Sequence, residues 1–223
     1  MSETSENFIL EPDAVGYLKR YDIPYPDHGV AHTPQEAVKI ADRLGYPVVL
    51  KSVSRAVIHK SDAGGVAVDL KNPDEVLDGY RGVIDRVQKA VANPPIEGVL
   101  VCQQASEGLE VIVGAIDDPV FGATIMFGLG GIFAEVFRDV AFRIAPLERI
   151  DAEEMIREIR GYPLLTGTRG QSGRDIDRLI DLLMAVSHLV TEKPNTKELD
   201  LNPVRLFEQG LMVLDVRMIE KGA

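Results

Sequence analysis

Two neighbouring groups of residues have the types and spacing that phosphate binding requires. Lys51 ends the apolar run 47–50, and the glycine pair Gly64 and Gly65 follows shortly after it. A lysine carries a compact charge on a long stem, and paired glycines allow backbone N–H groups to approach phosphate oxygens. Together they predict a site for a diphosphate. The alternative is a solvated edge lysine followed by an ordinary β-turn.

His59 precedes this glycine pair by a few residues, in the run Ile58-His-Lys-Ser-Asp-Ala-Gly-Gly65. Neutral imidazole is a good nucleophile near pH 7. His59 beside a phosphate loop is therefore a candidate to take up a phosphoryl group directly. The alternative is a capping or core histidine with no part in chemistry.

A further group, near the C-terminus, is rich in oxygen atoms. Glu198, Asp200 and Asn202 fall on one side of a predicted strand, and Asp215 lies on the next one. Mg²⁺ prefers oxygen ligands and keeps room for water and phosphates. We therefore interpret the group as a candidate magnesium site. The alternative is a polar strand face that ends in an Asn-Pro turn.

Two weaker groups lie in the middle of the sequence. Glu110 begins a strand just after Gln103 and Gln104. A chain crossing between lobes offers backbone groups to an adenine, and a carboxylate can hold ribose hydroxyls, although a surface glutamate is the default. The second group comprises Glu135, Arg138, Asp139 and Arg143. Two interpretations fit it equally well: arginines that stabilise a transferring phosphoryl group, or a cluster of surface ion pairs.

The elements that must position these residues follow from periodicity and caps. Thr33-Pro-Gln-Glu36 is a capping box, and Asn72-Pro-Asp-Glu75 repeats its logic. The pattern predicts helices over 11–19, 34–44, 73–87, 151–160 and 175–190. It predicts strands over 47–53, 66–70, 98–103, 109–115, 122–127, 132–137, 141–144, 197–201 and 211–216. Because strands and helices do not alternate as regular βαβ units, the expected class is α+β.

Composition excludes several classes of protein. The 223 residues carry a formal net charge of −11, which argues against a nucleic-acid binder and against adsorption to an anionic membrane. No apolar run approaches the roughly 20 residues of a membrane span. Cys102 is the single cysteine and can form no internal disulfide. The first residues are polar and acidic, unlike a signal peptide, so we expect a soluble, cytoplasmic protein.

Familiar catalytic motifs are missing. The sequence has no GxGxxG, no GxxxxGK[ST] loop, no Cys/His cluster and no serine elbow. Six ordered motifs instead resemble the ATP-grasp beta subunit of ADP-forming acyl-CoA synthetases, a relative of the succinyl-CoA synthetase beta subunit. They are Gly45-Tyr-Pro-Val-Val-Leu-Lys51, His59-Lys-Ser-Asp-Ala-Gly-Gly-Val66, Leu109-Glu-Val-Ile-Val-Gly114, Asp118-Pro-Val-Phe-Gly122, Met126-Phe-Gly-Leu-Gly-Gly-Ile-Phe133 and Glu198-Leu-Asp-Leu-Asn-Pro203.

The resemblance implies an ATP-grasp fold, in which two α+β lobes clasp a nucleotide. We expect a larger lobe from residues 1–20 plus 101–223 and a smaller phosphate-loop lobe from 21–100. The site residues it implies fall into three groups. ATP or ADP is held by Lys51, Lys60, Gly64, Gly65, Gln103, Gln104 and Glu110; Mg²⁺ by Asn202 and Asp215; and the catalytic pair is His59 with Asp200.

The same resemblance implies the chemistry. His59 is expected to relay a phosphoryl group between the nucleotide and a histidine on a separate alpha subunit, which carries the CoA and acyl sites, in an α₂β₂ assembly. At the hinge between the two lobes, members of the family often have Glu-Met or Arg-Met where this chain has Gln103-Gln104. The preference for ATP or GTP therefore stays open. Two alternatives stay open: a nucleotide-sensing regulatory domain without catalysis, and an ATP-grasp ligase that joins a carboxylate to an amine.

Overall fold

The computed structural model describes residues 7–57, 60–131, 139–168 and 172–222. The chain forms two compact units. The larger unit comprises Met1–Tyr25 and Glu107–Ala223, and the smaller unit comprises Pro26–Ser106. The chain therefore enters the smaller unit after Tyr25 and leaves it after Ser106.

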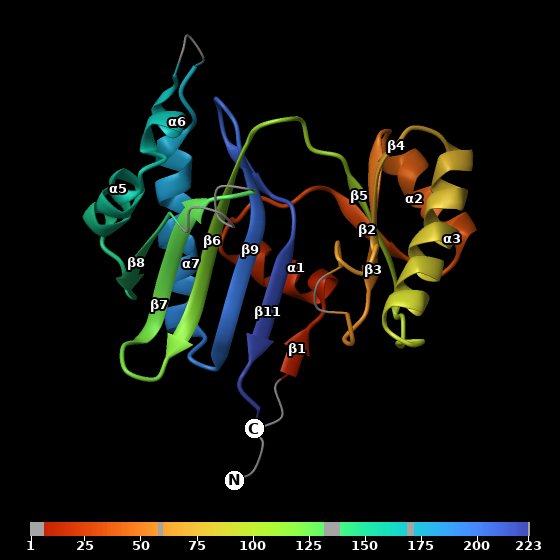
Figure 1. Cartoon of the computed structure of the whole chain (residues 1–223), viewed down its shortest axis with the longest axis horizontal. Helices are drawn as coiled ribbons and strands as arrows, with labels where there is room; N and C mark the ends of the chain where they lie inside the picture. The colour runs from red at the N-terminus through yellow and green to blue at the C-terminus, as the bar shows by residue number, and fades with distance from the viewer. Residues whose placement is uncertain (1–6, 58–59, 132–138, 169–171, 223) are drawn as a thin grey trace. The chain divides into compact units, whose positions relative to one another are not determined.

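The larger unit is built on a seven-stranded antiparallel sheet (Figure 1). Its strand order is β1-β11-β9-β6-β7-β8, with β10 paired to β9. The strands are β1 (Asn7–Ile9), β6 (Leu109–Asp118), β7 (Gly122–Leu129), β8 (Val140–Ile144), β9 (Thr196–Leu206), β10 (Leu211–Val213) and β11 (Val216–Glu220). The helices are α1 (Glu11–Arg20), α5 (Arg149–Glu158), α6 (Tyr162–Thr166) and α7 (Ile176–Glu192).

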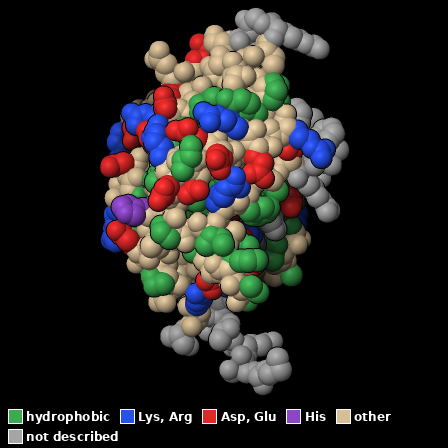
Figure 2. Space-filling model, turned by 90° about the vertical axis from the view of Figure 1, so that its left-hand side faces the viewer, with side chains coloured by type: hydrophobic (Ala, Val, Ile, Leu, Met, Phe, Trp, Pro, Cys, Tyr) green, Lys and Arg blue, Asp and Glu red, His purple; other side chains and the backbone are tan. Residues whose placement is uncertain are grey.

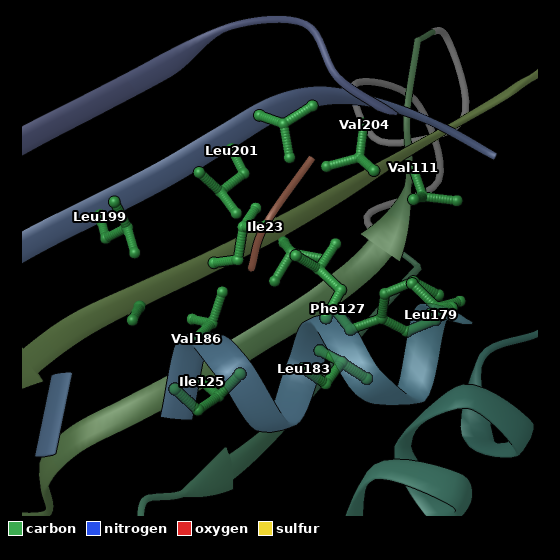
Figure 3. Packing of buried hydrophobic residues seen from close by; sticks show 14 of the residues in the cluster. Ile23, Val111, Ile125, Phe127, Leu179, Leu183, Val186, Leu199, Leu201 and Val204 are labelled. Atoms are coloured by element: carbon green, nitrogen blue, oxygen red, sulfur yellow. The ribbon is translucent and has the colours of Figure 1, made fainter. Parts of the chain in front are cut away.

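The core of the larger unit lies between this sheet and α7 (Figure 3). Leu179, Leu183 and Val186 of α7 meet side chains from the facing strands, which include Val111, Ile125, Phe127, Leu199 and Leu201. Because strand side chains alternate between faces, the residues between these positions point to the opposite side of the sheet. We call that side the second face of the sheet; it carries Glu198, Asp200 and Asn202.

The smaller unit is a four-stranded antiparallel sheet covered by two helices. Its order is β2-β5-β3-β4, from β2 (His28–Ala31), β3 (Val48–Val53), β4 (Val66–Leu70) and β5 (Gly98–Gln103). The helices α2 (Pro34–Leu44) and α3 (Pro73–Ala90) pack on it. The unit has its own core, to which Val48 and Leu50 of β3 and Val76 and Val83 of α3 belong.

Both helices of the smaller unit begin where the sequence predicts. The Thr33 side chain accepts a hydrogen bond from the Glu36 N–H at 3.2 Å, and Asn72 accepts one from Glu75 at 3.0 Å. A proline follows each cap at the first helical position, where its missing N–H costs nothing. The α+β class is confirmed, because each unit combines an antiparallel sheet with helices. No helix of the described residues is long and apolar enough to cross a membrane.

Several expected strands differ from the structure at the edges of the sheets. The sequence does not predict β1 and β2, and the strand predicted over 211–216 is wrong. The chain instead forms β10, breaks at Leu214 and Asp215, and continues as β11. In the break, Leu214 N donates to Pro203 O at 2.9 Å and Asn202 N donates to Asp215 O at 3.2 Å. The strand expected over 132–137 lies outside the described residues.

Candidate functional site

Lys51 lies on an internal strand. In β3 it pairs with Leu100 of β5 on one side and Val66 of β4 on the other. Only 7% of its surface is exposed. Its neighbours Val48 and Leu50 face the core under the helices, so strand alternation places Lys51 on the opposite face. The alternative of a solvated edge lysine is therefore excluded.

The glycine pair closes a tight turn beside β3. Gly64 N donates to Ser61 O at 3.0 Å and Gly65 N donates to Lys60 O at 2.7 Å. Gly65 O in turn accepts from Ser52 N at 2.8 Å, which fastens the turn to the strand. Because both glycine N–H groups are donated inside the turn, the two glycines act here by shaping the backbone.

Each glycine is required for its own reason. Gly64 has a φ of +66°, a left-handed conformation that disfavours residues with a Cβ. Gly65 has no space for a Cβ, which would press on Ser52 Oγ and lie 3.0 Å from Lys60 O. His59 lies outside the described residues, and so do Glu135 and Arg138.

The two glutamines stand at the end of β5. Gln103 N donates to Asp27 O at 2.9 Å, and Gln104 N donates to Pro47 O at 3.1 Å. The Gln104 side chain accepts from Asp69 N at 2.6 Å. The hydrogen bond from the Lys71 side chain to Asp69 raises the pKa of Lys71. The side-chain amide oxygen of Gln104 thus connects the end of β5 to the backbone of β4.

Glu110 belongs to the larger unit and has an ion-pair partner. Arg205 Nη2 donates to Glu110 Oε1 at 2.6 Å, between directly opposed positions of β6 and β9. Glu110 O also accepts from Gly130 N at 2.8 Å, and a Cβ on Gly130 would lie 3.0 Å from the Glu110 carbonyl carbon. The default of a simple surface glutamate does not describe this residue, since both its side chain and its backbone are held.

The oxygen-rich group stands on the second face of the sheet, in β9. Asp200 lies opposite Gly114 of β6 on one side and Arg217 of β11 on the other. Arg217 forms an ion pair with Glu198. Glu198 is therefore already paired with a protein cation. Asp200 and Asn202 follow it along this face.

A bulge in β9 sets the position of Asn202. Val111 and Val113 of β6 are two residues apart, yet they pair with Val204 and Leu201, which are three apart. The extra residue lies at Asn202-Pro203, and a bulge of this kind re-aims side chains while both flanking residues stay in the core. The predicted Asn-Pro turn does not end the strand, because β9 continues to Leu206.

The bulge brings Asn202 next to Asp215. Asn202 is exposed, Asp215 is half-buried, and the backbone bond from Asn202 N to Asp215 O joins them at 3.2 Å. Among the described residues, no three His, Cys, Asp or Glu side chains form a metal-binding group. The oxygens that these two side chains carry, one amide and one carboxylate, are nevertheless of the types that fit Mg²⁺, which is commonly held by one or two protein groups plus water and phosphates.

Asp139 and Arg143 have structural partners. Arg143 forms an ion pair with Glu158 at 2.8 Å, and Asp139 accepts from the N–H groups of Arg160 at 2.8 Å and Gly161 at 2.7 Å. On the side of the molecule seen in Figure 2, acidic and basic side chains are interspersed in the same way. The interpretation as ion pairs therefore holds for Arg143, whereas Asp139 accepts hydrogen bonds from two backbone N–H groups just before α6.

Comparison with known proteins gives consistent matches along the whole chain. The model of the ATP-grasp domain matches residues 1–219. The chain is 45% identical over 211 residues to the beta subunit of acetate–CoA ligase [ADP-forming] I from Pyrococcus furiosus, covering 95% of this chain and 91% of that one. The chain belongs to the ATP-grasp family of ADP-forming acyl-CoA synthetase beta subunits. The family and the fold predicted from the six motifs are confirmed.

Solved structures support the same membership. Acetyl-coenzyme A synthetase 1 of Ca. Korarchaeum cryptofilum, in complex with coenzyme A and Ca-AMPCP, matches with a TM-score of 0.93 and 45% identity over 96% of this chain and 93% of that chain. Another structure of that protein contains Mg-AMPPCP, with a phosphohistidine segment that points towards the nucleotide binding site. Acetate–CoA ligase [ADP-forming] I from Archaeoglobus fulgidus is 44% identical, but this chain spans 31% of its length.

Sequence reasoning missed two residues that hold members of the candidate site. Arg205 pairs with Glu110 across 95 positions of sequence, and its spacing from Glu110 carries no signal before the register of β6 and β9 is known. Arg86 donates to the carbonyl of Gly64. Its position beside the buried stripe of α3 gives a hint, because the neighbouring residue Val87 faces the core.

Proposed function

We propose that this chain is the nucleotide-binding subunit of an ADP-forming acyl-CoA synthetase of the acetate–CoA ligase type. The overall reaction is acyl-CoA + ADP + phosphate = carboxylic acid + ATP + CoA. Phosphate displaces CoA to form an acyl phosphate, the phosphoryl group passes to histidine, and ADP finally accepts it. The observation that carries the proposal is the match over more than nine-tenths of both chains with a protein crystallised with nucleotide analogues.

We assign the residues of the smaller unit to the phosphates. Lys51 and Lys60 supply positive charge, and Gly64 and Gly65 give the turn its shape. Phosphoryl transfer depends mainly on positioning and charge neutralisation, which is what a buried lysine beside a closed turn provides. Gln103 and Gln104 are assigned to the base, with the choice between adenine and guanine open.

We assign residues of the larger unit to the ribose and the metal, and one residue of each unit to the relay. Glu110, held by Arg205, is assigned to the ribose hydroxyls, and Asn202 and Asp215 to Mg²⁺. Mg²⁺ bound there supplies charge neutralisation for the phosphates. His59 is assigned as the histidine that accepts the phosphoryl group, with Asp200 as the carboxylate that orients its imidazole.

A separate alpha chain is proposed to supply CoA and acyl binding. The Pyrococcus relatives are described as beta subunits of nearly the same length as this chain, whereas the Archaeoglobus relative is about three times longer on one polypeptide. The Archaeoglobus relative thus carries, on one polypeptide, more than the part that this chain matches. We propose an α₂β₂ assembly that acts in the cytoplasm.

Nucleotide binding tests the phosphate assignment. Lys51→Ala is expected to weaken binding of Mg-ADP by about tenfold or more, because a charge-assisted contact is worth roughly 1.5–3 kcal/mol. Titration calorimetry measures the dissociation constant. Lys39→Ala removes an equal charge from the exposed side of α2 and serves as the matched control. Equal affinity of Lys51→Ala and wild type would remove Lys51 from the site.

Labelling with [γ-³²P]ATP and Mg²⁺ tests the relay. We expect an acid-labile, base-stable label on the wild type, none on His59→Ala, and full labelling of His188→Ala, whose histidine is exposed on α7. A wild type that binds nucleotide but takes up no label would favour the sensing alternative. A label that survives in His59→Ala would place the relay on another histidine.

A further inference from the structure

The glycine turn is fastened on two sides, and the second fastening is a side chain from α3. Arg86 Nε donates to Gly64 O at 2.8 Å, and Arg86 Nη2 lies 3.4 Å from Val66 O. On its other side the turn is bound to β3 through Ser52 N and Gly65 O. One arginine therefore grips the carbonyls on both sides of Gly65.

The contact is also a packing contact. A Cβ added to Gly64 would lie 2.9 Å from Arg86 Cδ and 3.0 Å from Arg86 Cβ. The aliphatic part of the arginine thus lies directly over the Gly64 backbone. With a φ of +66° and no side chain of its own, Gly64 depends on such outside contacts to keep one orientation of its peptide groups.

Helix α3 is adapted to this placement of Arg86. Val83 and Val87 face the core, and Arg86 lies between them in sequence at the edge of the buried stripe. One turn earlier stands Gly82, where a Cβ would lie 3.0 Å from Arg86 Nη1. Glycine is among the least favourable residues inside a helix, and at this position it leaves space for the guanidinium group.

We propose that Arg86 is a positioning residue for the nucleotide phosphates. It fixes the turn 60–65 in the closed form and so holds Lys60 where the phosphates bind. The planar fork of the guanidinium allows two carbonyls to be held at once, which a lysine ammonium does not reproduce. This inference rests on the proposed function of the turn, and the experiment below separates the two.

The test compares variants of equal bulk on the same helix. Arg86→Met keeps an aliphatic chain over Gly64 and removes the donors, and Arg86→Lys keeps the charge. Arg81→Met is the matched control, because Arg81 is an exposed residue of α3 that pairs with Asp78 at 3.5 Å, one helical turn away. The wild type and the three variants each comprise all 223 residues. Arg86 is exposed, so the variants are expected to fold.

Two measurements are made on each protein. Hydrogen exchange of peptides that cover 60–65 reports the turn, since local opening sets the exchange rate. We expect about tenfold faster exchange in Arg86→Met, a smaller effect in Arg86→Lys, and wild-type rates in Arg81→Met. Affinity is measured for Mg-ADP and for adenosine. We expect Arg86→Met to weaken Mg-ADP about tenfold and to leave adenosine unchanged, because adenosine has no phosphate.

Results other than these would contradict one part of the proposal each. Unchanged exchange in Arg86→Met would show that Arg86 does not hold the turn. Faster exchange with unchanged Mg-ADP affinity would show that the held turn does not serve phosphates, as would an equal loss for ADP and adenosine. If the wild type itself failed to bind Mg-ADP, the proposed function would be lost, while the exchange result would still decide whether Arg86 fixes the turn.

Discussion

Lys51 illustrates how the surroundings decide the role of a single side chain. Its type and spacing alone fit both a solvated lysine and a phosphate ligand, and its burial on an internal strand removes the first interpretation. Glu110 changes in the same way, because a glutamate fixed by Arg205 at 2.6 Å presents its carboxylate in one orientation. A ligand group held in place loses less entropy on binding than a free one.

The pair Asn202 and Asp215 gives a prediction at the residue scale. Asp215→Asn removes the negative charge of one of the two proposed ligands, so the Mg²⁺ concentration for half-maximal ADP binding should rise about tenfold. A Mg²⁺ titration of ADP binding by calorimetry measures it. Asp22→Asn, at an exposed residue with a φ of 53° that Asn tolerates, is the control. An unchanged half-maximal Mg²⁺ concentration in Asp215→Asn would show that Asp215 does not bind the metal.

At the scale of elements, the glycines separate into those that the fold requires and those that it does not. Gly65 lies against the backbone of Lys60 and the side chains of Ser52 and Val87. Gly16 stands inside α1, where a Cβ would meet nothing within 4 Å. The same residue type therefore has opposite consequences in a crowded turn and in an open helix.

Matched alanine substitutions test this contrast. Gly65→Ala is expected to lower the free energy of unfolding by about 1–3 kcal/mol, as overpacking does. Gly16→Ala is expected to raise it by roughly 1 kcal/mol, because alanine is the better helix former. Urea unfolding followed by circular dichroism measures both. A Gly65→Ala protein as stable as the wild type would mean that the turn accommodates a side chain.

At the scale of the whole molecule, each unit has its own hydrophobic core. The core of the larger unit is centred on α7 and its facing strands, and that of the smaller unit on β3, β5 and α3. Leu183 and Leu50 are fully buried members of the two cores. Units with separate cores tend to unfold as separate cooperative blocks.

Calorimetry of the full chain tests this separation. We expect two thermal transitions, with a calorimetric enthalpy larger than the van't Hoff enthalpy. Leu50→Ala and Leu183→Ala each remove about 2–5 kcal/mol from the block they belong to, so each should lower a different transition. A single transition that both variants lower equally would show that the chain unfolds as one block.

Much of this protein is readable from its sequence because the signals are local. Capped helices such as α2 and α3, and apolar β-branched strands such as β3 and β5, are specified by residues a few positions apart. The motifs that indicate the family are likewise short runs of residues, and their order is read directly from the sequence. These helices, strands and motifs can be predicted without knowing which elements pack against one another.

Tertiary structure alone decided the remainder. The short strands β1 and β2 exist because β11 and β5 pair with them, and the break at Asp215 follows from its backbone bond to Asn202. The partnership of Glu110 with Arg205 and the hold of Arg86 on Gly64 join residues that are distant in sequence. Such contacts depend on strand register and helix placement, which the whole chain must fold to establish.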